Sequence, residues 1–317
     1  MLMSPVLAFN AYSQNVRPEI QSIVKEIADY NVLDGPIVGY SGSKSKQWDR
    51  FKKLYSQSGI DELRTLTSHD NAVVRCYAFK ALMFMDFQSL FPIVLKHLND
   101  TVYVHTLDNC VGVTTMVGDY FLDHFPANPV QKNTIDSILF NDKNIKLWAK
   151  YKFIQDLKPE QQYYIQLRKI AIEDNYPIAI VAIAKYNIKT DINLISTLFD
   201  RKETEVYGID AAKKFPDSSF YHYLVNIFKN DWSKKYYDYP KWRNLYQALA
   251  KYPSQQTLNL FDKTIKTKND FRHQVLGKYL LIALTKYPNP LFDRLLSRIT
   301  LRYEYKNDIE DEINIEQ

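Results

Sequence analysis

Hydrophobic positions in the C-terminal half of the chain recur in a fixed pattern of one small and one aromatic residue. Four segments, AIAKYN, AAKKFP, ALAKYP and ALTKYP, each place Ala four residues before an aromatic residue and Lys immediately before it. Residues four apart share one face of a helix, and a small residue lets a neighbouring helix approach closely. The pattern therefore predicts a series of packed helices. The Ala and aromatic pairs are Ala182 and Tyr186, Ala211 and Phe215, Ala248 and Tyr252, and Ala283 and Tyr287.

The spacing of these segments predicts a repeat. Their aromatic residues lie 29, 37 and 35 positions apart, which suggests a unit of about 35 residues. Lysine near a helix end complements the partial negative charge of the last carbonyl groups. The proline that follows three of the aromatic residues stops the helix, and the apolar positions beyond it begin the next one. Each unit is thus expected to be a pair of helices.

A helix is also predicted in the N-terminal half, in the segment TSHDNAVVRCYAFKALM. Asp70 or Asn71 can cap its first turn. Cys76 lies within this helix and is expected to be a small buried hydrophobic residue, not a reactive thiol. An apolar stripe at helical spacing supports the helix and is made of Val73, Val74, Tyr77, Ala78, Ala81 and Leu82.

This segment resembles the repeats of HEAT and armadillo-type α-solenoids. In those repeats one helix precedes a short turn with Asp or Asn, and a second helix carries Val and Arg near its start. The stretch DELRTLTSHDNAVVRCYAFKAL matches that arrangement with Asp70, Asn71, Val74 and Arg75. The resemblance implies that Arg75 bonds the turn and a neighbouring repeat. It covers about residues 17 to 300, except that over 100 to 150 Gly112 and Gly118 leave the helix boundaries uncertain.

We therefore predict an all-α fold, a right-handed α-solenoid of about seven to eight stacked helical pairs. Residues 17–303 would form it as one continuous domain with a concave face, because each pair buries its core against the next. The last ten residues carry five acidic residues and no base, so residues 304–317 are expected to form a disordered tail. The sequence does not indicate an oligomeric state.

The first residues, MLMSPVLAFNAYSQN, allow two interpretations. A short apolar stretch followed by small and polar residues is typical of the end of a secretory signal peptide, which would make the protein periplasmic or secreted. The segment lacks a basic start, so residues 1–16 also fit a disordered start of a cytoplasmic protein. Localisation therefore stays open between export and the cytoplasm. No run of 18 or more apolar residues occurs, and no membrane span is expected.

Residues that carry metal or covalent chemistry are few and scattered. Two cysteines in 317 residues exclude a disulfide framework and a cysteine-based zinc site, and Cys76 and Cys110 are expected to be free thiols. The six histidines form no i, i+4 pair and no metal motif. The segment GYSGSKSK lacks the glycine spacing of a phosphate-binding loop and the partner motifs of a serine acylase. We expect no metal and no cofactor, and no residue is assigned a catalytic role.

The segment KNDWSKKYYDYPKWRNLY, residues 229–246, is the strongest candidate for binding. It lies in the longest repeat and is predicted to be an extended loop between helices. Aromatic residues among cations bind single-stranded nucleic acid by stacking, or a protein partner through Trp, Tyr and Arg. Alternatively, Trp242 and Tyr246 begin a helix and pack inward, and the lysines only solvate the loop. The candidate binding residues are Trp232, Lys234, Lys235, Tyr236, Tyr237, Tyr239, Lys241 and Arg243.

Two functions fit this architecture. A non-catalytic scaffold would bind a protein or peptide partner through the concave face and the 229–246 loop. A nucleic-acid binding or processing protein, of the type of the HEAT-like DNA glycosylases, would use a basic concave face. The net charge of +5 becomes +10 without the last ten residues, which carry −5; this is compatible with nucleic acid but modest. An enzyme whose active site is assembled from distant repeats stays a third alternative.

Overall fold

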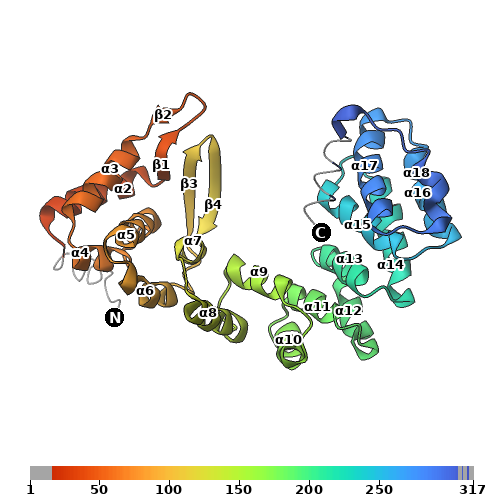
Figure 1. Cartoon of the computed structure of the whole chain (residues 1–317), viewed down its shortest axis with the longest axis horizontal. Coiled ribbons are helices and arrows are strands. Elements are labelled where there is room, and N and C mark those ends of the chain that lie inside the picture. The colour runs from red at the N-terminus through yellow and green to blue at the C-terminus, as the bar shows by residue number, and fades with distance from the viewer. Residues whose placement is uncertain (1–15, 306–308, 310–312, 314–317) are drawn as a thin grey trace, which may run out of the picture. The chain divides into compact units, whose positions relative to one another are not determined.

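Figure 1 shows the computed structural model of the chain, which describes residues 16–305, 309 and 313. This part is mostly helical, as predicted, but it also contains a small mixed sheet, so the prediction of a purely α fold is wrong here. The chain divides into two compact units, residues 1–153 and 154–317, where the sequence suggests one continuous domain. We call them unit 1 and unit 2 and describe each by itself. The two interpretations of the N-terminus concern residues outside the described part.

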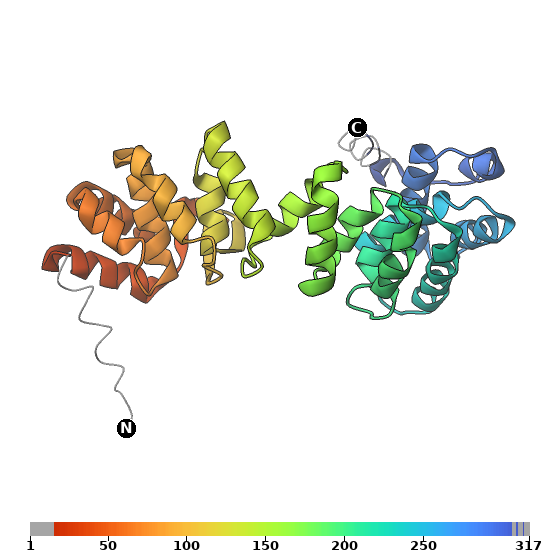
Figure 2. The same cartoon turned by 90° about the horizontal axis from the view of Figure 1, so that it is seen from below.

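The helices of unit 1 follow one another in chain order across the view of Figure 2, coloured from red to yellow-green. Helix α9 (Trp148–Asp156) crosses the boundary between the units. The strands are β1 (Leu33–Val38), β2 (Ser43–Lys44), β3 (Tyr103–Asn109) and β4 (Val111–Met116). The other helices are α2 (Pro18–Tyr30), α3 (Lys46–Gln57), α4 (Ile60–Leu66), α5 (Ala72–Met85), α6 (Leu90–Lys96), α7 (Val117–His124) and α8 (Pro129–Asn141), with a 3-10 turn, η2 (Phe87–Ser89), before α6.

Helix α5 lies at the centre of unit 1, and its sequence explains why. Its N-cap is Asn71, whose side chain accepts hydrogen bonds from the backbone of Val73 and Val74 at 2.9 and 3.1 Å. Apolar residues follow at nearly every position, so the helix is buried on most sides and packs against α2, α3, α4 and α7. Tyr77 donates a hydrogen bond to the backbone oxygen of Asp34 at 2.9 Å, which ties α5 to β1.

The sheet of unit 1 has the strand order β2-β1-β3-β4. β1 runs parallel to β3, and the other two neighbouring pairs are antiparallel. A tight turn at Asn109, whose φ is 52°, and Cys110 closes the hairpin of β3 and β4. The stretch around Gly112, where the sequence leaves helix boundaries uncertain, is this hairpin. Its valines and threonines have stiff branched side chains that favour strands.

Both cysteines are free, as predicted. Cys76 is fully buried in α5, and burial raises the pKa of its thiol far above the ordinary value, so the thiol is not a nucleophile. Cys110 lies in the exposed hairpin turn. Cys110 follows Cys76 by 34 residues, about one repeat, but the two do not occupy equivalent helical positions, because the stretch around Cys110 is a β-hairpin.

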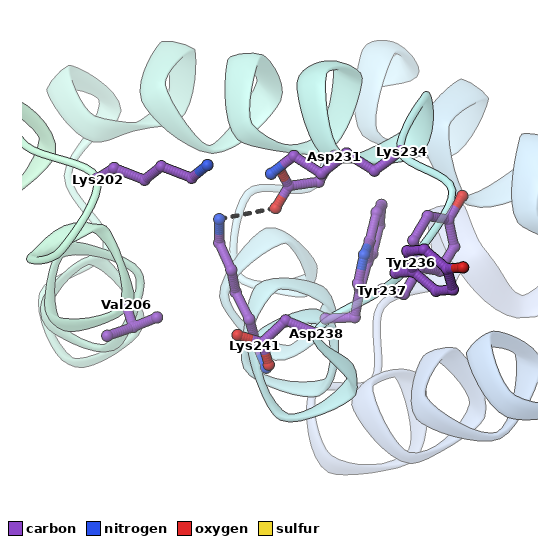
Figure 3. A pocket seen from close by; sticks show the side chains of 9 residues that line it. Lys202, Val206, Asp231, Lys234, Tyr236, Tyr237, Asp238 and Lys241 are labelled. Carbon is purple, nitrogen blue, oxygen red and sulfur yellow. Dashed lines mark hydrogen bonds and ion pairs between the residues drawn. The ribbon is translucent and has the colours of Figure 1, made fainter.

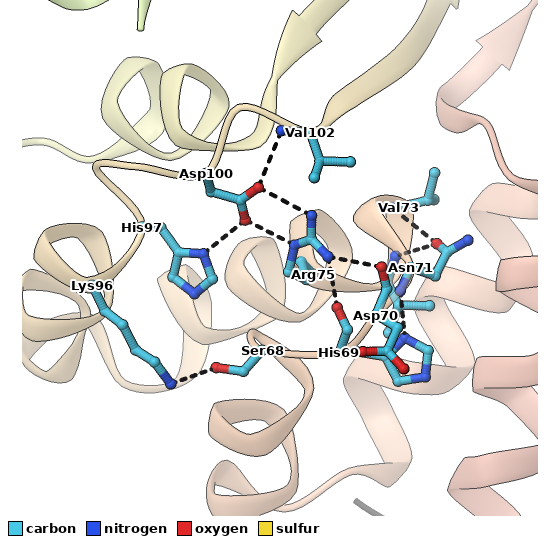
Figure 4. Close-up of polar contacts among 11 residues, drawn as sticks. Ser68, His69, Asp70, Asn71, Val73, Arg75, Lys96, His97, Asp100 and Val102 are labelled. Carbon is cyan, nitrogen blue, oxygen red and sulfur yellow. Dashed lines mark hydrogen bonds and ion pairs between the residues drawn. The ribbon is translucent and has the colours of Figure 1, made fainter. Parts of the chain in front are cut away.

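Arg75 joins the start of α5 to the loop after α6 (Figure 4). Its guanidinium donates hydrogen bonds to the backbone oxygens of His69 and Asp70 at 2.7 and 2.9 Å. It also donates to Asp100 Oδ1 at 3.1 Å, and His97 Nδ1 lies 3.0 Å from Oδ2 of the same carboxylate. Arg75 therefore contacts both the turn before its own helix and the loop after the next helix.

Among its described residues, unit 2 contains helices and their connections and no strand (Figure 1, green to blue). Three short 3-10 turns, η3 (Lys189–Asp191), η4 (Thr197–Phe199) and η5 (Pro290–Phe292), flank its shorter helices. The helices are α10 (Gln161–Glu173), α11 (Pro177–Ala184), α12 (Ile192–Ser196), α13 (Glu205–Lys214), α14 (Ser218–Trp232), α15 (Tyr239–Ala250), α16 (Gln255–Ile265), α17 (Asp270–Lys286) and α18 (Asp293–Leu296).

The four helices that carry the repeated motif pack in series. α11 contacts α13, α13 contacts α15, and α15 contacts α17. Close approach of neighbouring helices requires a small residue at the contact. All four motif alanines are accordingly buried, with exposed fractions of 2% or less: Ala182, Ala211, Ala248 and Ala283.

The motif aromatic residues lie at or just past the helix ends, not on the helix face that carries the alanine. Tyr186 donates a hydrogen bond to the backbone oxygen of Glu160 at 2.7 Å, and Tyr252 donates to that of Ala212 at 3.1 Å. Phe215 is buried. The Tyr287 ring centre lies 4.7 Å from Lys251 Nζ. Tyr186, Tyr252 and Tyr287 therefore connect the ends of their helices to earlier segments of unit 2.

The C-terminal segment is described at few positions. Ile309 is buried and, with Ile313, packs in a cluster that contains Ile282 of α17 and Leu301. The acidic residues of the last ten positions lie outside the described residues. None of the described helices combines the length and the apolar character that a bilayer span requires.

Candidate binding site

Most of the candidate segment 229–246 is helical, so the prediction of an extended loop is wrong. α14 continues to Trp232 and α15 begins at Tyr239, which leaves only residues 233–238 between them. Asp238 accepts a hydrogen bond from the backbone of Lys241 at 3.1 Å, and Pro240 occupies the first turn of α15. An Asp cap followed by Pro is a helix-start signal. The sequence Asp238-Tyr239-Pro240 therefore predicts the start of α15.

Two aromatic residues of the segment belong to the core. Trp242 is 1% exposed and Tyr246 is fully buried. The Tyr246 hydroxyl lies 2.7 Å from Thr264 Oγ1, which satisfies both polar groups within the interior. The part of the alternative interpretation in which these two residues begin a helix and pack inward is therefore confirmed. Its other part, that the lysines only solvate the loop, is wrong for Lys241, which is buried.

Lys241 is buried in an ion network and is not an exposed binding residue. Its Nζ lies 2.7 Å from Asp231 Oδ2 and also bonds Glu205, while Lys234 pairs with the other oxygen of Asp231. Burial by itself lowers the pKa of Lys241, but the hydrogen bonds to Asp231 and Glu205 outweigh it and raise that pKa above the ordinary value. The charged lysine thus links α13, α14 and α15, which supply Glu205, Asp231 and Lys241.

Trp232 and Tyr237 have cations next to their ring faces. The Arg272 guanidinium lies 4.3 Å from the Tyr237 ring centre, and Lys263 Nζ lies 5.0 Å from that of Trp232. Phe228 stacks on Trp232 with ring centres 5.5 Å apart. Cations are attracted to the negative faces of aromatic rings. These contacts attach the connection between α14 and α15 to α16 and α17.

The remaining candidates are more open to solvent. Tyr236 is 79% exposed, and Lys235 beside it is exposed as well. Tyr239 and Arg243 are partly buried, and the Tyr239 ring meets Phe271 edge-on at 6.2 Å. Of the aromatic residues in the segment, only Tyr236 therefore presents most of its ring to a partner.

Two small pockets lie side by side between the starts of α13 and α15. They have volumes of about 200 and 280 Å³. Val206, Asp238 and Lys241 line both, so the pockets form one surface, which we call the α13–α15 groove. The first pocket adds Lys202, Asp231, Lys234, Tyr236, Tyr237 and Trp242, and the second adds Ile209, Pro240 and Asn244.

The lysines of the groove differ in whether they have an ion-pair partner. Figure 3 shows Lys202 and Lys241 extending from different elements toward Asp231. Lys241 is bonded to Asp231, whereas Lys202 is exposed and has no ion-pair partner within residues 16–305. Apolar carbon from Val206, which is 38% exposed, lies in the same pocket as Lys202. The groove thus offers one unpaired cation beside an apolar surface.

Several residues of this region are not among the candidates chosen from the sequence. They include Lys202, Lys263 and Arg272. For Arg272, and also for Glu205, the repeat spacing is a signal that would locate the residue. Glu205 and Lys241 are 36 positions apart, and Tyr237 and Arg272 are 35 positions apart. Residues about one repeat apart lie on neighbouring helices of such a series.

Comparison of the chain with protein-family profiles, with curated proteins and with solved structures gave no match. Within the described residues, no group of three or more His, Cys, Asp or Glu is placed to hold a metal ion. Function must therefore be inferred from the groove and its surroundings.

Proposed function

We propose that this protein is a non-catalytic scaffold whose C-terminal unit is a HEAT-like helical repeat and binds a segment of a partner protein in the α13–α15 groove. The unpaired ammonium of Lys202 beside the exposed side chain of Val206 carries the proposal. In such sites apolar contact supplies affinity, and a few polar groups fix the orientation of the ligand. The favoured partner segment therefore has an acidic residue next to an aliphatic one.

The repeat character of unit 2 supports a scaffold. Four helices with the same motif pack in series, each with a buried alanine, and side chains one repeat apart meet across neighbouring helices. In repeat proteins of this kind, each unit contacts only its neighbours, and the exposed surface along the series is the usual place of binding. The exposed ring of Tyr236 at the groove adds an aromatic anchor of the type enriched in protein interfaces.

Nucleic-acid binding is the alternative, and one observation favours it. Burial and then the charge of Lys214 lower the pKa of both Lys185 and Lys251, so each of these two motif lysines lies near Lys214. A row of cations suits a phosphate backbone. However, Lys185 already donates to two backbone oxygens at 2.6 and 2.7 Å, and Lys214 is paired with Asp210 at 2.6 Å.

The aromatic residues also favour a protein partner. Base stacking needs open ring faces. Trp242 is buried, and Trp232 and Tyr237 have cations or another ring against them. We therefore place the peptide-binding scaffold first.

Selection of a displayed random peptide library against the full chain tests the proposal. We expect enriched peptides with an acidic residue beside an aliphatic one, and binding of a synthetic representative should weaken about tenfold or more in Lys202→Glu and in Val206→Asp, since tenfold corresponds to about 1.4 kcal/mol. Lys229→Glu is the matched control, because Lys229 is exposed on α14 and does not line the groove. Equal binding by all three variants would place the site elsewhere.

A salt titration separates the two functions. A nucleic-acid binder loses affinity for a single-stranded oligonucleotide steeply as salt rises, and removing phosphate contacts flattens that dependence. The scaffold proposal predicts weak oligonucleotide binding that the triple variant Lys234→Ala, Lys235→Ala, Arg243→Ala leaves unchanged. Tight binding whose salt dependence is flattened by the triple variant would replace the scaffold with the alternative.

A further inference from the structure

β4 is one of the two edge strands of the sheet in unit 1, and within the described residues no strand pairs with its outer edge (Figure 1). Its sequence, VGVTTM, contains no charged residue and no proline. Val111 and Val113 are 64% and 53% exposed. Sheet edges are normally protected by charges, proline, bulges or short length. The opposite edge follows that rule, because β2 has two residues and one of them is Lys44.

The hairpin register shows which backbone groups of β4 face outward. Val117 donates to the backbone oxygen of Val102 at 3.0 Å, directly after the last paired residues of β4 and β3. Hydrogen-bonded and non-hydrogen-bonded pairs alternate along an antiparallel ladder. Val111 and Val113 therefore direct their N–H and C=O groups toward β3, and Gly112 and Thr114 direct theirs to the open edge. This edge can accept another extended strand.

We propose that β4 pairs with β4 of a second copy of this chain, antiparallel and related by a twofold axis through Gly112. Val111 of each copy then lies opposite Val113 of the other. The outward N–H and C=O groups of Gly112 bond the same groups of its counterpart. An interface in which both copies use the same patch closes as a dimer.

The side chains of β4 match this occupant. The register forms two Val–Val cross-strand pairs from residues that are exposed in the single chain, and branched cross-strand pairs stabilise sheets. Like charges placed opposite each other would oppose a twofold pairing, and β4 has no charged residue. Val111 and Val113 stand on either side of Gly112, so a twofold axis through Gly112 pairs valine with valine at both positions. This match favours a second copy of the chain over an unrelated strand.

The dimer is expected to be weak. A contact made by one pair of short strands buries less than the roughly 1,200 Å² of typical stable interfaces. We therefore expect a dissociation constant in the micromolar range, with monomer at about 1 μM and mostly dimer above about 100 μM. Sedimentation velocity of the full chain over this range measures the equilibrium.

Charge substitutions test both the interface and its register. In the double variant Val111→Lys, Val113→Lys, each lysine faces a lysine of the other copy, and the dissociation constant should rise at least about tenfold. In Val111→Glu, Val113→Lys, each glutamate faces a lysine, and the constant should return to within about threefold of the unmodified chain. Val130→Lys on α8 is the control, because Val130 is 75% exposed and lies outside the sheet; it should leave the constant unchanged.

A monomer at every concentration would overturn the proposal. So would a dimer that the two-lysine variant leaves intact while its circular dichroism spectrum is unchanged. Equal weakening by both charge variants would exclude this register.

Disulfide cross-linking decides the question independently of these variants. Opposed residues of a hydrogen-bonded pair have Cα atoms about 5.5 Å apart, within disulfide range. A Cβ atom at Gly112 would meet its nearest neighbours at 3.8 and 3.9 Å, so Gly112→Cys fits without strain. In a Cys110→Ser background, Gly112→Cys should form a covalent dimer on mild oxidation, and Val130→Cys should not. The natural Cys110 should also fail to cross-link, because the two copies would lie about 14 Å apart along the strands. Failure of Gly112→Cys to cross-link above 100 μM would refute the proposed axis.

Discussion

The Arg75 guanidinium and the Asp100 carboxylate form a nearly buried ion pair, with Nε 3.0 Å from Oδ2 and side-chain exposures of 8% and 13%. Burial by itself raises the pKa of Asp100, but the hydrogen bond from His97 and the charge of Arg75 outweigh it and hold that pKa below the ordinary value. The carboxylate is therefore ionised at neutral pH. The pair joins the turn before α5 to the loop that leads into β3.

Removing one partner of this pair should destabilise unit 1 strongly. Asp100→Ala leaves a buried guanidinium without its counter-charge, and breaking a buried pair in this way costs about 3–5 kcal/mol. Arg75→Met removes two turn contacts as well and should cost a similar amount. The double variant Arg75→Met, Asp100→Leu should cost clearly less than the sum of the two, because it leaves no unpaired charge. Urea unfolding of the four proteins gives the coupling free energy.

Arg64→Ala is the control for that cycle. Arg64 is 46% exposed and pairs with Asp86 at the surface of unit 1, so its loss should change the urea midpoint much less. Additive effects of the Arg75 and Asp100 changes would show that the two groups stabilise the unit separately.

The Glu62 carboxylate should make part of the stability of unit 1 depend on pH. Hydrogen bonds from the Arg17 side chain, at 2.8 and 3.1 Å, act with backbone N–H groups to lower the pKa of Glu62 from 4.5 to about 2. Because the folded pKa lies below the unfolded one, the stabilisation is complete above pH 4.5 and is lost as the pH falls toward 2. The urea midpoint of the unmodified chain should therefore exceed that of Glu62→Gln at pH 6, and the difference should narrow at pH 3.

Glu26→Gln controls for the general effect of acid, since Glu26 is 55% exposed and pairs with Arg50 at 3.1 Å. Its midpoint should follow that of the unmodified chain at both pH values. A Glu62→Gln difference that stays constant from pH 6 to pH 3 would contradict the assigned ionisation.

The helices of unit 2 could be predicted from the sequence because their signals are local. Each motif alanine is followed within a few residues by a lysine and an aromatic residue, and the helices end where these letters stand. The strands of unit 1 were harder to predict from the sequence. In β1 the sequence Asp34-Gly35-Pro36 is typical of a turn. Glycine is needed there for another reason: the Asp108 side chain of β3 lies so close that a Cβ atom on residue 35 would be 2.4 Å from Asp108 Oδ1. That requirement comes from a strand more than 70 residues away.

The candidate site shows the same limit. Composition identified a segment rich in aromatic and basic residues, but it did not distinguish the exposed Tyr236 from the buried Trp242. Helical phase after Asp238 and Pro240 gives that distinction, once α15 is known to begin there. The pairing of Lys241 with Glu205 depends on the packing of α15 against α13, which no local pattern contains.

We therefore expect Lys241 to stabilise the folded chain and not to contact a partner at the surface. Lys241→Ala leaves Asp231 and Glu205 close together without the shared cation, and loss of one member of a buried ion network costs about 3 kcal/mol or more. Lys235→Ala, six residues earlier on the exposed connection, should stay within about 0.5 kcal/mol of the unmodified chain. Urea unfolding at pH 7 measures both. Equal stability of the two variants would mean that Lys241 is solvated in solution. Lys241 would then again be a candidate for contact with a partner.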